Sequence, residues 1–256
     1  MDGCSGRHLI LADVGGRNMA IANILVVDDE KEIAELEELY LSNDGYDVWK
    51  AFSGEEGLAI LEKENIDLAL IDIMMPGMSG LEMCKQIRKN SNIPIIMVSA
   101  KSGDGDKILG LATGADDYIT KPFNPLELTA RVKSQLRRYK QFNPNSIQQQ
   151  DNTVEDEFDI RVKGLEISRK DHKVVVYGEE INLTPIEFDI LYLMASNPGK
   201  VFNADEIFEK VWNEEVFGAN NTVMVHIRRL RGKLKDDTRD EKIIKTVYGV
   251  GYKVER

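Results

Sequence analysis

The chain has 256 residues, a length typical of two ordinary domains. Its residues are 42% hydrophobic and 30% charged, and no apolar run reaches the ~20 residues of a membrane span, so we expect these domains to be globular. Its two cysteines, Cys4 and Cys84, exclude a disulfide framework and favour a reducing cytoplasm. The net charge is −11, but residues 220–256 hold ten basic and five acidic residues, so an acidic front precedes a basic tail. That asymmetry is typical of a regulatory or metal-binding part joined to a nucleic-acid-binding part, although a solvated charged face would also explain it.

The first part of the chain predicts an α/β domain. Residues 1–22 read as a disordered, vector-derived leader before a plausible native start at Met19. Five apolar, β-type runs follow, each with a helical segment after it. The expected strands are 23–27, 46–51, 68–72, 95–98 and 117–120, and the later helices are 54–63, 79–88, 106–113 and 125–138. In the first helix we expect one apolar face formed by Ile33, Leu36, Leu39 and Tyr40. The pattern predicts a doubly wound, five-stranded parallel sheet over residues 23–139.

Polar residues stand at the ends of four predicted strands. They are Asp28 and Asp29, Asp72, Ser99, and Lys121. Right-handed crossovers place all the carboxyl ends of parallel strands on one edge, so these side chains can meet. Taken alone, each residue also has a purely structural explanation: an aspartate can cap a helix, a serine can belong to a turn, and a lysine can simply be exposed. Together they predict a Mg²⁺ site of Asp28, Asp29 and Asp72, a carboxylate nucleophile at Asp72, and Lys121 and Ser99 as partners of a phosphoryl group.

A polar segment, 140–157, reads as a linker to a second domain at 158–256. Short strands are expected at 158–162, 165–168 and 173–177, then helices beginning at Thr184, Asn203 and Asn220, and a hairpin around Tyr248-Gly249. Three helices closed by a hairpin describe an α+β winged helix.

The residues of both parts resemble one family. VVDDE at 26–30, LIDIMMPGMSG at 70–80, MVSAK at 97–101 and ADDYITKPF at 115–123 look like the receiver domain of two-component response regulators. LTPIEFDIL at 183–191, NNTVMVHIRRLRGKL at 220–234 and IKTVYGVGYKV at 244–254 look like the winged-helix domain of the OmpR/PhoB subfamily. The match covers nearly all of residues 23–254, and PFNPLELTARVKSQLRRYK is similar to VanR-type regulators.

The resemblance implies a phosphorylation-activated transcriptional regulator, not an enzyme. Asp72 would accept phosphate from a sensor histidine kinase, and Met74 would add its backbone carbonyl to the Mg²⁺ site. Ser99 and Tyr118 would form the switch, with the ring of Tyr118 turning inward. Alternatively, Tyr118 is only a half-buried aromatic residue of a strand, without a role in switching. We expect a cytoplasmic protein whose partners are promoter DNA, in direct repeats, and RNA polymerase.

The helix over 220–235 has an apolar stripe and basic residues on its other faces, as a recognition helix needs. Arg229 is the candidate for a base contact, and His226 is expected at a DNA phosphate or on the surface rather than at a metal. Family members often carry arginine at the wing tip, where this chain has Tyr248. The full set of expected DNA contacts is Thr222, Val225, His226, Arg228, Arg229, Arg231, Lys233, Lys245 and Tyr248, with Lys253 as a further phosphate contact.

Relatives in the family dimerise through the fourth helix, fifth strand and fifth helix of the receiver. The corresponding residues are Lys107, Ile108, Leu111, Asp117, Glu127 and Arg131. We expect Lys107 to pair with Glu127, and Asp117 with Arg131, across a two-fold axis, although Glu127 could instead complete a helix cap with Asn124. The alternative function is a Mg²⁺-dependent phosphohydrolase of the haloacid dehalogenase type. That class wants an acid two residues after the nucleophile, where this chain has Met74.

Overall fold

The computed structural model describes residues 20–100, 104–142, 158–212, 220–238 and 241–255, without the side chains of residues 104–108, 141–142 and 220. Most of the expected leader lies outside these residues. Its end does not: Ala22 is buried, and the backbone N–H of Ile21 donates to Gly45. Among the described residues, no helix is long and apolar enough to cross a bilayer.

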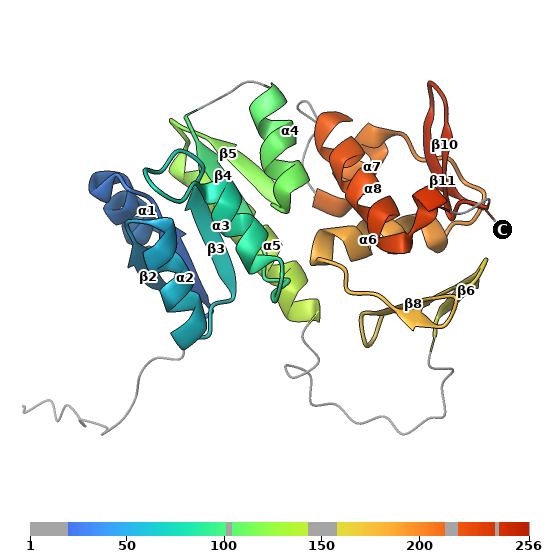
Figure 1. Cartoon of the computed structure of the whole chain (residues 1–256), viewed down its shortest axis with the longest axis horizontal. Coiled ribbons are helices and arrows are strands. Elements are labelled where there is room, and N and C mark those ends of the chain that lie inside the picture. The colour runs from blue at the N-terminus through green and yellow to red at the C-terminus, as the bar shows by residue number, and fades with distance from the viewer. Residues whose placement is uncertain (1–19, 101–103, 143–157, 213–219, 239–240, 256) are drawn as a thin grey trace, which may run out of the picture.

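The N-terminal domain is a five-stranded parallel sheet in the order β2-β1-β3-β4-β5, with helices on both faces (Figure 1). The fold class is as predicted. The strands are β1 (Asn23–Val27), β2 (Asp47–Ala51), β3 (Leu68–Asp72), β4 (Ile95–Ser99) and β5 (Asp117–Thr120). The helices are α1 (Lys31–Asn43), α2 (Gly54–Lys63), α3 (Gly80–Ile87), α4 (Asp104–Thr113) and α5 (Pro125–Phe142). Helix α5 thus continues past residue 138, where the sequence suggested its end.

Alternate residues of each strand build two apolar layers. In β1, Ile24 and Val26 pack with α1 and α5, whereas Leu25 and Val27 pack on the side of α2 and α3. A strand with period-two side chains can be apolar throughout only when both faces are covered. That arrangement fixes the carboxyl edge of the sheet, where the predicted polar residues lie.

Helix α1 corrects one prediction. We expected its apolar face to be inward, yet Leu36 and Leu39 are 39% and 55% exposed. The buried positions are Ala34, Glu37 and Leu41, which also follow the helical period. Counting apolar residues chose the wrong face, because this helix turns a carboxyl group toward the sheet.

The C-terminal domain is a winged helix. Helices α6 (Pro185–Ala195), α7 (Ala204–Trp212) and α8 (Asn220–Leu234) pack on one core, closed by the hairpin of β10 (Ile244–Val247) and β11 (Gly251–Val254). An antiparallel sheet precedes them, formed by β6 (Ile160–Val162), β7 (Leu165–Ser168), β8 (Lys173–Val176) and β9 (Glu179–Glu180). A short 3-10 turn, Asp236–Thr238, follows α8. The sequence did not suggest β9 or this turn.

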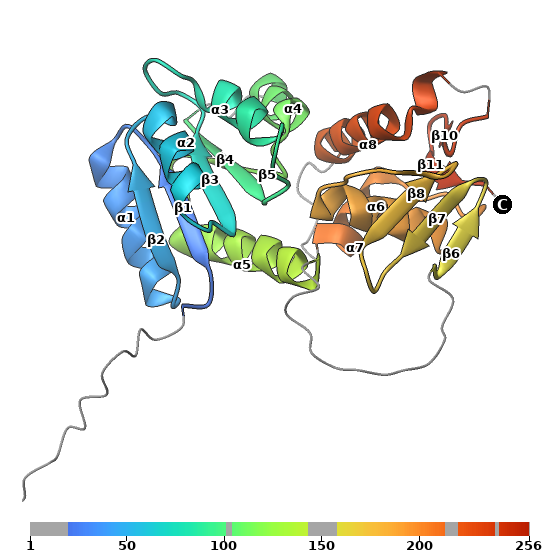
Figure 2. The same cartoon turned by 60° about the horizontal axis from the view of Figure 1, so that its bottom comes forward.

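The two domains are in direct contact. Helix α4 lies beside α8, and α5 runs to α6 and α7, as Figures 1 and 2 both show. The Ser134 hydroxyl lies 3.4 Å from the carbonyl oxygen of Trp212, and the Arg138 guanidinium donates to the carbonyl of Val211. The helix expected to read DNA therefore lies against the N-terminal domain.

Candidate functional site

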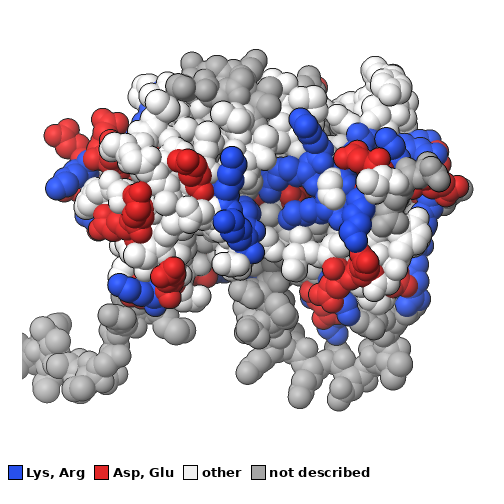
Figure 3. Space-filling view, in the orientation of Figure 1, with Lys and Arg blue, Asp and Glu red and all other residues white. Residues whose placement is uncertain are grey.

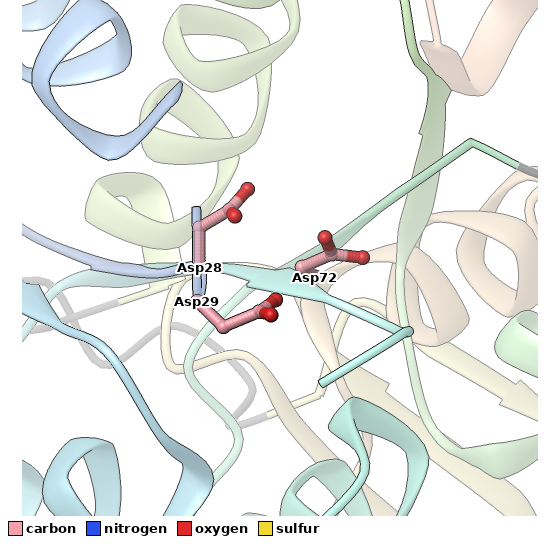
Figure 4. Close-up of side chains that lie close together, drawn as sticks. All are labelled: Asp28, Asp29 and Asp72. Carbon is pink, nitrogen blue, oxygen red and sulfur yellow. The ribbon is translucent and has the colours of Figure 1, made fainter. Parts of the chain in front are cut away.

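Three carboxylates meet at the carboxyl edge of the parallel sheet. Asp28 and Asp29 follow β1, and Asp72 ends the neighbouring strand β3. One oxygen from each lies within 4.8 Å of the others, and Figure 4 shows the side chains converging. Asp28 and Asp72 are buried. Among the described residues this cluster offers the oxygen-rich donor set that Mg²⁺ prefers.

Backbone contacts hold the loops of this site. The N–H of Glu30 donates to Asp28 Oδ1 at 2.9 Å, and that of Met74 donates to Asp72 Oδ1 at 3.0 Å. A Cβ atom at Gly80 would lie 2.1 Å from the carbonyl oxygen of Asp72. Only glycine therefore lets α3 begin so close to the end of β3.

Lys121 provides the cation at the centre of the cluster. Its Nζ lies 2.6 Å from Asp28 Oδ2 and 2.7 Å from Asp72 Oδ2. Burial alone would lower the pKa of Lys121, but the hydrogen bonds to the two aspartates outweigh it and raise the pKa. For Asp28, burial is the larger effect, and its pKa is raised despite Lys121. The ammonium group thus neutralises the carboxylates from the side of β5.

The remaining residues predicted for this site lie nearby. Ser99 is fully buried at the end of β4, the strand next to Asp72. The Tyr118 side chain is only 8% exposed, with its ring against Gly110 of α4. The ring is thus buried in this structure. Met74 has a 54% exposed side chain and no acidic group at the position where a dehalogenase-type hydrolase would have one.

Glu37 of α1 belongs to the electrostatics of this site, and the sequence analysis missed it. It is 1% exposed, and its Oε1 has no hydrogen-bond partner in the described part of the chain. Burial, and after it the charge of Asp28, raise the pKa of Glu37 to about 8 against the opposing effect of Lys121. The sequence did contain one indication that Glu37 is buried, because its spacing from Ala34 and Leu41 places all three on one side of the helix.

The predicted DNA contacts fall into an open and a covered group. Arg228 is exposed, Thr222 is partly exposed, and the wing-tip Tyr248 is 92% exposed. Figure 3 shows basic side chains gathered across the middle of the molecule and over the winged-helix half. The tip of the wing thus presents an aromatic ring and not a guanidinium.

Several basic residues of this region already have partners. Arg231 donates to the carbonyl of Ile244 at 3.0 Å and to Thr246 Oγ1 at 2.8 Å, which ties α8 to the wing. Lys245 and Lys253 pair with Glu255 at 2.6 and 3.1 Å. These contacts position the helix and wing as one unit.

Val225, His226 and Arg229 form the covered group. Val225 is 4% exposed and packs with the core of the N-terminal domain. Arg229 Nη1 lies 2.8 Å from the carbonyl oxygen of Ala115 and 3.4 Å from that of Leu111. Its Nη2 lies 2.9 Å from Glu187 Oε1 of α6.

Glu187 joins two basic residues of α8. Its other oxygen, Oε2, lies 2.7 Å from Nζ of Lys233. Burial would raise the pKa of Glu187, but Arg229 and Lys233 hold it below its ordinary value.

The structure contradicts the surface position that we expected for His226, while its contact with a DNA phosphate stays a prediction. The His226 side chain is fully buried, with the centre of its ring 5.4 Å from that of Trp212. It lies beside the backbone of Asp116, and neither ring nitrogen has a hydrogen bond of ordinary geometry among the described residues. Burial, and after it the charge of Arg229, lower the pKa of His226 to about 3. The cause is the domain contact, which the sequence of one helix does not reveal.

The residues predicted for a dimer interface pair within the chain. Arg131 binds Asp117 at 3.0 Å and Glu127 at 3.1 Å. Leu111 is 1% exposed. The side chains of Lys107 and Ile108 lie outside the described residues. Pairing across a two-fold axis stays a prediction, and it would require Arg131 to exchange partners.

Comparison with known proteins agrees with this geometry. Residues 24–133 match the response regulator receiver domain, and residues 178–254 match the C-terminal domain of transcriptional regulatory proteins. Regulatory protein VanRc of Enterococcus gallinarum is 48% identical over 233 residues, which cover 91% of this chain and 98% of that protein. VanR of Enterococcus faecium is 49% identical over 234 residues, with 91% and 98% covered.

A solved structure of a RitR mutant covers 92% of this chain and 99% of its own, at 25% identity and a TM-score of 0.68. That match covers both domains of the present chain. The identities to whole regulators extend over both domains. The chain therefore belongs to the OmpR/PhoB family of two-component response regulators, with a receiver followed by a winged-helix DNA-binding domain.

Proposed function

We propose that Asp72 accepts one phosphoryl group from a sensor histidine kinase, and that this event controls binding of promoter DNA by α8 and the wing. The observation that supports it is the meeting of Asp72 with Asp28, Asp29 and Lys121 at one sheet edge. A buried carboxylate with a cation at 2.7 Å suits a nucleophile that will carry additional negative charge.

In the transfer, a carboxylate oxygen of Asp72 attacks phosphorus as the phosphorus–nitrogen bond to the kinase histidine breaks. Lys121 neutralises charge on the phosphoryl oxygens, since this chemistry depends mainly on positioning and electrostatics. Asp28, Asp29 and Asp72, with the backbone carbonyl of Met74, would hold Mg²⁺. When bound, the ion offsets negative charge on the transferred group.

The switch that we propose joins Ser99 to Tyr118. The Ser99 hydroxyl binds a phosphoryl oxygen on Asp72, which ends the neighbouring strand. Movement of the loop after β4 then changes the packing of the Tyr118 ring on Gly110. Because α4 touches α8, a change at this ring has a short route to the DNA-binding domain.

At the DNA, we propose that Arg229 contacts a base and that Arg228, Lys233 and the lysines of the wing contact phosphates. A cytoplasmic homodimer, formed through α4, β5 and α5 of phosphorylated receivers, would place two winged helices on a direct repeat. RNA polymerase is the further partner that a promoter-bound regulator would meet.

The test is incubation with acetyl phosphate and Mg²⁺, followed by mass spectrometry of the intact protein. We expect one phosphoryl group on the wild type and none on Asp72→Asn. Asp47→Asn, an exposed aspartate at the start of β2, is the matched control and should be labelled normally. A full-occupancy adduct on Asp72→Asn would refute the assignment, and continuous release of phosphate would favour the hydrolase alternative.

A further inference from the structure

We propose that the cavity between α5 of the receiver and helices α6 and α7 of the winged helix binds a small anion that carries two linked phosphate groups. The cavity has a volume of about 520 Å³. None of its lining residues belongs to the carboxylate cluster around Asp72. The inference is therefore independent of the phosphorylation proposed for that residue.

Basic side chains from both domains converge on this cavity. Arg137 and Arg138 belong to α5, Arg169 to the turn after β7, and Lys210 to α7, while Asp189 of α6 is the acidic residue of the lining. Four basic residues and one acidic residue give the lining a net charge of +3, in a chain whose net charge is −11. Because like charges that are brought together repel each other, a bound anion would stabilise this arrangement.

The carboxylate of Asp189 does not neutralise these cations by contact. Burial raises the pKa of Asp189 to about 6, although the charges of Arg138, Arg169 and Arg137 oppose this effect. The carboxylate therefore lies within the field of the three guanidinium groups. Among the described residues, however, it forms no ion pair with any of them. A space remains between the opposite charges, and this space is where a ligand fits.

The helix ends beside the cavity give a second reason for positive charge there. Helices α6 and α7 both end at the cavity, and the C-terminus of a helix attracts cations. Arg138 meets this need, since its guanidinium donates to the carbonyl of Val211. The side chains of Arg137, Arg169 and Lys210 form no hydrogen bond or ion pair within the described part of the chain. These three side chains retain their donors for a ligand.

The chemistry of the lining favours phosphate groups. The planar fork of a guanidinium matches two phosphate oxygens, and three arginines supply that geometry from different directions. One phosphate group carries a charge of about −1.5 to −2 near neutral pH, so a single group leaves part of the lining uncompensated and two groups balance it. The side chains of Arg137, Arg169 and Lys210 are exposed, so a ligand reaches them from solvent.

The aromatic ring at the cavity serves to position one of the arginines. The guanidinium of Arg169 lies over the ring of Tyr192, 5.0 Å from its centroid, and the ring of Phe188 stacks with that of Tyr192 at 5.9 Å. Recognition therefore depends on the phosphate groups, which either free pyrophosphate or a nucleoside diphosphate supplies. A ligand held by Arg137 and Arg169 would contact both domains, so its affinity should depend on each of these residues.

Isothermal titration calorimetry of the full chain with pyrophosphate, ADP and orthophosphate tests the site. The buffer is free of Mg²⁺, so that no metal at the carboxylate cluster can hold the ligand, and the pH and ionic strength are fixed. We expect saturable binding of one pyrophosphate per chain. Orthophosphate should bind at least about tenfold more weakly, because it lacks the charged hydrogen bonds of the second group.

Substitutions on both sides of the cavity locate the ligand. Arg137→Ala and Arg169→Ala should each weaken pyrophosphate binding by about tenfold, the effect of losing one charged hydrogen bond. Asp189→Asn removes the repelling carboxylate and should strengthen binding. The matched control is Lys170→Ala, since Lys170 is the exposed neighbour of Arg169 outside the lining. Arg228→Ala controls for adsorption to the exposed basic residues of α8. Neither control should change the affinity.

The comparison of pyrophosphate with ADP identifies the source of the phosphate groups. Tighter binding of pyrophosphate would support a free diphosphate as the ligand, and tighter binding of ADP would support a nucleoside diphosphate in the same cavity. Three results would overturn the proposal: no saturable binding in the millimolar range, equal affinity for orthophosphate and pyrophosphate, or a loss in Arg228→Ala as large as in Arg137→Ala. Asp72→Asn should bind pyrophosphate like wild type, and a loss there would assign the ligand to the carboxylate edge instead.

Discussion

Replacing Glu37 by glutamine tests whether a neutral carboxyl group lies beneath the acidic site. The side chain is buried on α1, and its pKa is raised from 4.5 to about 8, first by burial and then by the charge of Asp28. A neutral acid in the folded state and a charged one in the unfolded state bind different numbers of protons, so stability must depend on pH.

The sign follows from the direction of the shift. Because the folded-state pKa is the higher one, the contribution of Glu37 to stability is fully present below pH 4.5 and is lost as the pH rises toward 8. With 1.36 kcal/mol for each pKa unit, the loss between pH 5.5 and 8.5 is about 3 kcal/mol. Glutamine has nearly the same shape and no proton to lose. The difference in unfolding free energy, Glu37→Gln minus wild type, should therefore be about 3 kcal/mol more positive at pH 8.5 than at pH 5.5.

Urea unfolding at pH 5.5 and 8.5, in Mg²⁺-free buffer, measures this difference. Trp49 lies on β2 of the receiver, so its fluorescence in a Trp212→Phe background reports on the correct domain. Glu35→Gln is the control, because Glu35 is exposed on the same helix. Parallel pH dependence in Glu37→Gln and wild type would show that the Glu37 carboxyl is not held neutral, and the reasoning would fail.

Three further predictions concern the ion pairs and the domain contact. Arg229→Ala should weaken specific DNA binding of the phosphorylated protein by about 1–3 kcal/mol and affect random DNA less, as measured by titration at one salt concentration; equal losses would make it a phosphate contact. The pKa of His226 lies at about 3, below its ordinary 6.5, so the contact between α8 and the receiver holds a neutral ring and should weaken as the pH falls below 6.5, by about tenfold at pH 5.5. The groups around this ring are Arg229, Glu187, Arg88 and the backbone of Asp116. Acrylamide quenching of Trp212 fluorescence in a Trp49→Phe background measures the opening, and a quenching curve that stays flat down to pH 5 would contradict the assignment. Lys121→Met leaves the carboxylates of Asp28 and Asp72 without their counter-ion, so the melting temperature should fall without Mg²⁺ and rise more than that of wild type when Mg²⁺ is added; an identical Mg²⁺ response would argue against a shared site.

Local sequence was sufficient wherever a strand end or a helix cap decided the structure. Apolar runs ending in Asp28, Asp72 and Ser99 implied parallel strands with one polar edge, and the structure places these residues there. Capping residues located α6, where the Glu187 carboxylate accepts from the backbone N–H of Thr184 at 2.9 Å, as one half of the expected capping box requires. Such features depend on neighbours within a few residues, which a sequence displays directly.

Features that depend on distant contacts could not be obtained in this way. The apolar period of α1 fitted two faces, and the buried Glu37 made the less hydrophobic face the inner one. His226 and Arg229 read as free basic residues, because nothing in α8 itself announces that Ala115, more than a hundred residues earlier, supplies an acceptor. Burial created between domains leaves no periodic pattern in either partner.

The contact between α8 and the receiver has a consequence for how much DNA the resting protein binds. The fraction of molecules in which α8 is free of the receiver would determine how much DNA is bound before any signal arrives. Moving a two-state chain from 1% to 99% open requires about 5.5 kcal/mol of preference for the open form. Each contact added to Arg229 or Arg138 would lower the DNA occupancy of the resting protein and would raise the free energy that a single phosphoryl group on Asp72 must supply to free α8. The strength of this contact would therefore set the ratio of DNA occupancy after phosphorylation to that before it. Variants that weaken the contact at Arg138 would bind more DNA at rest and would need less phosphorylation to free α8.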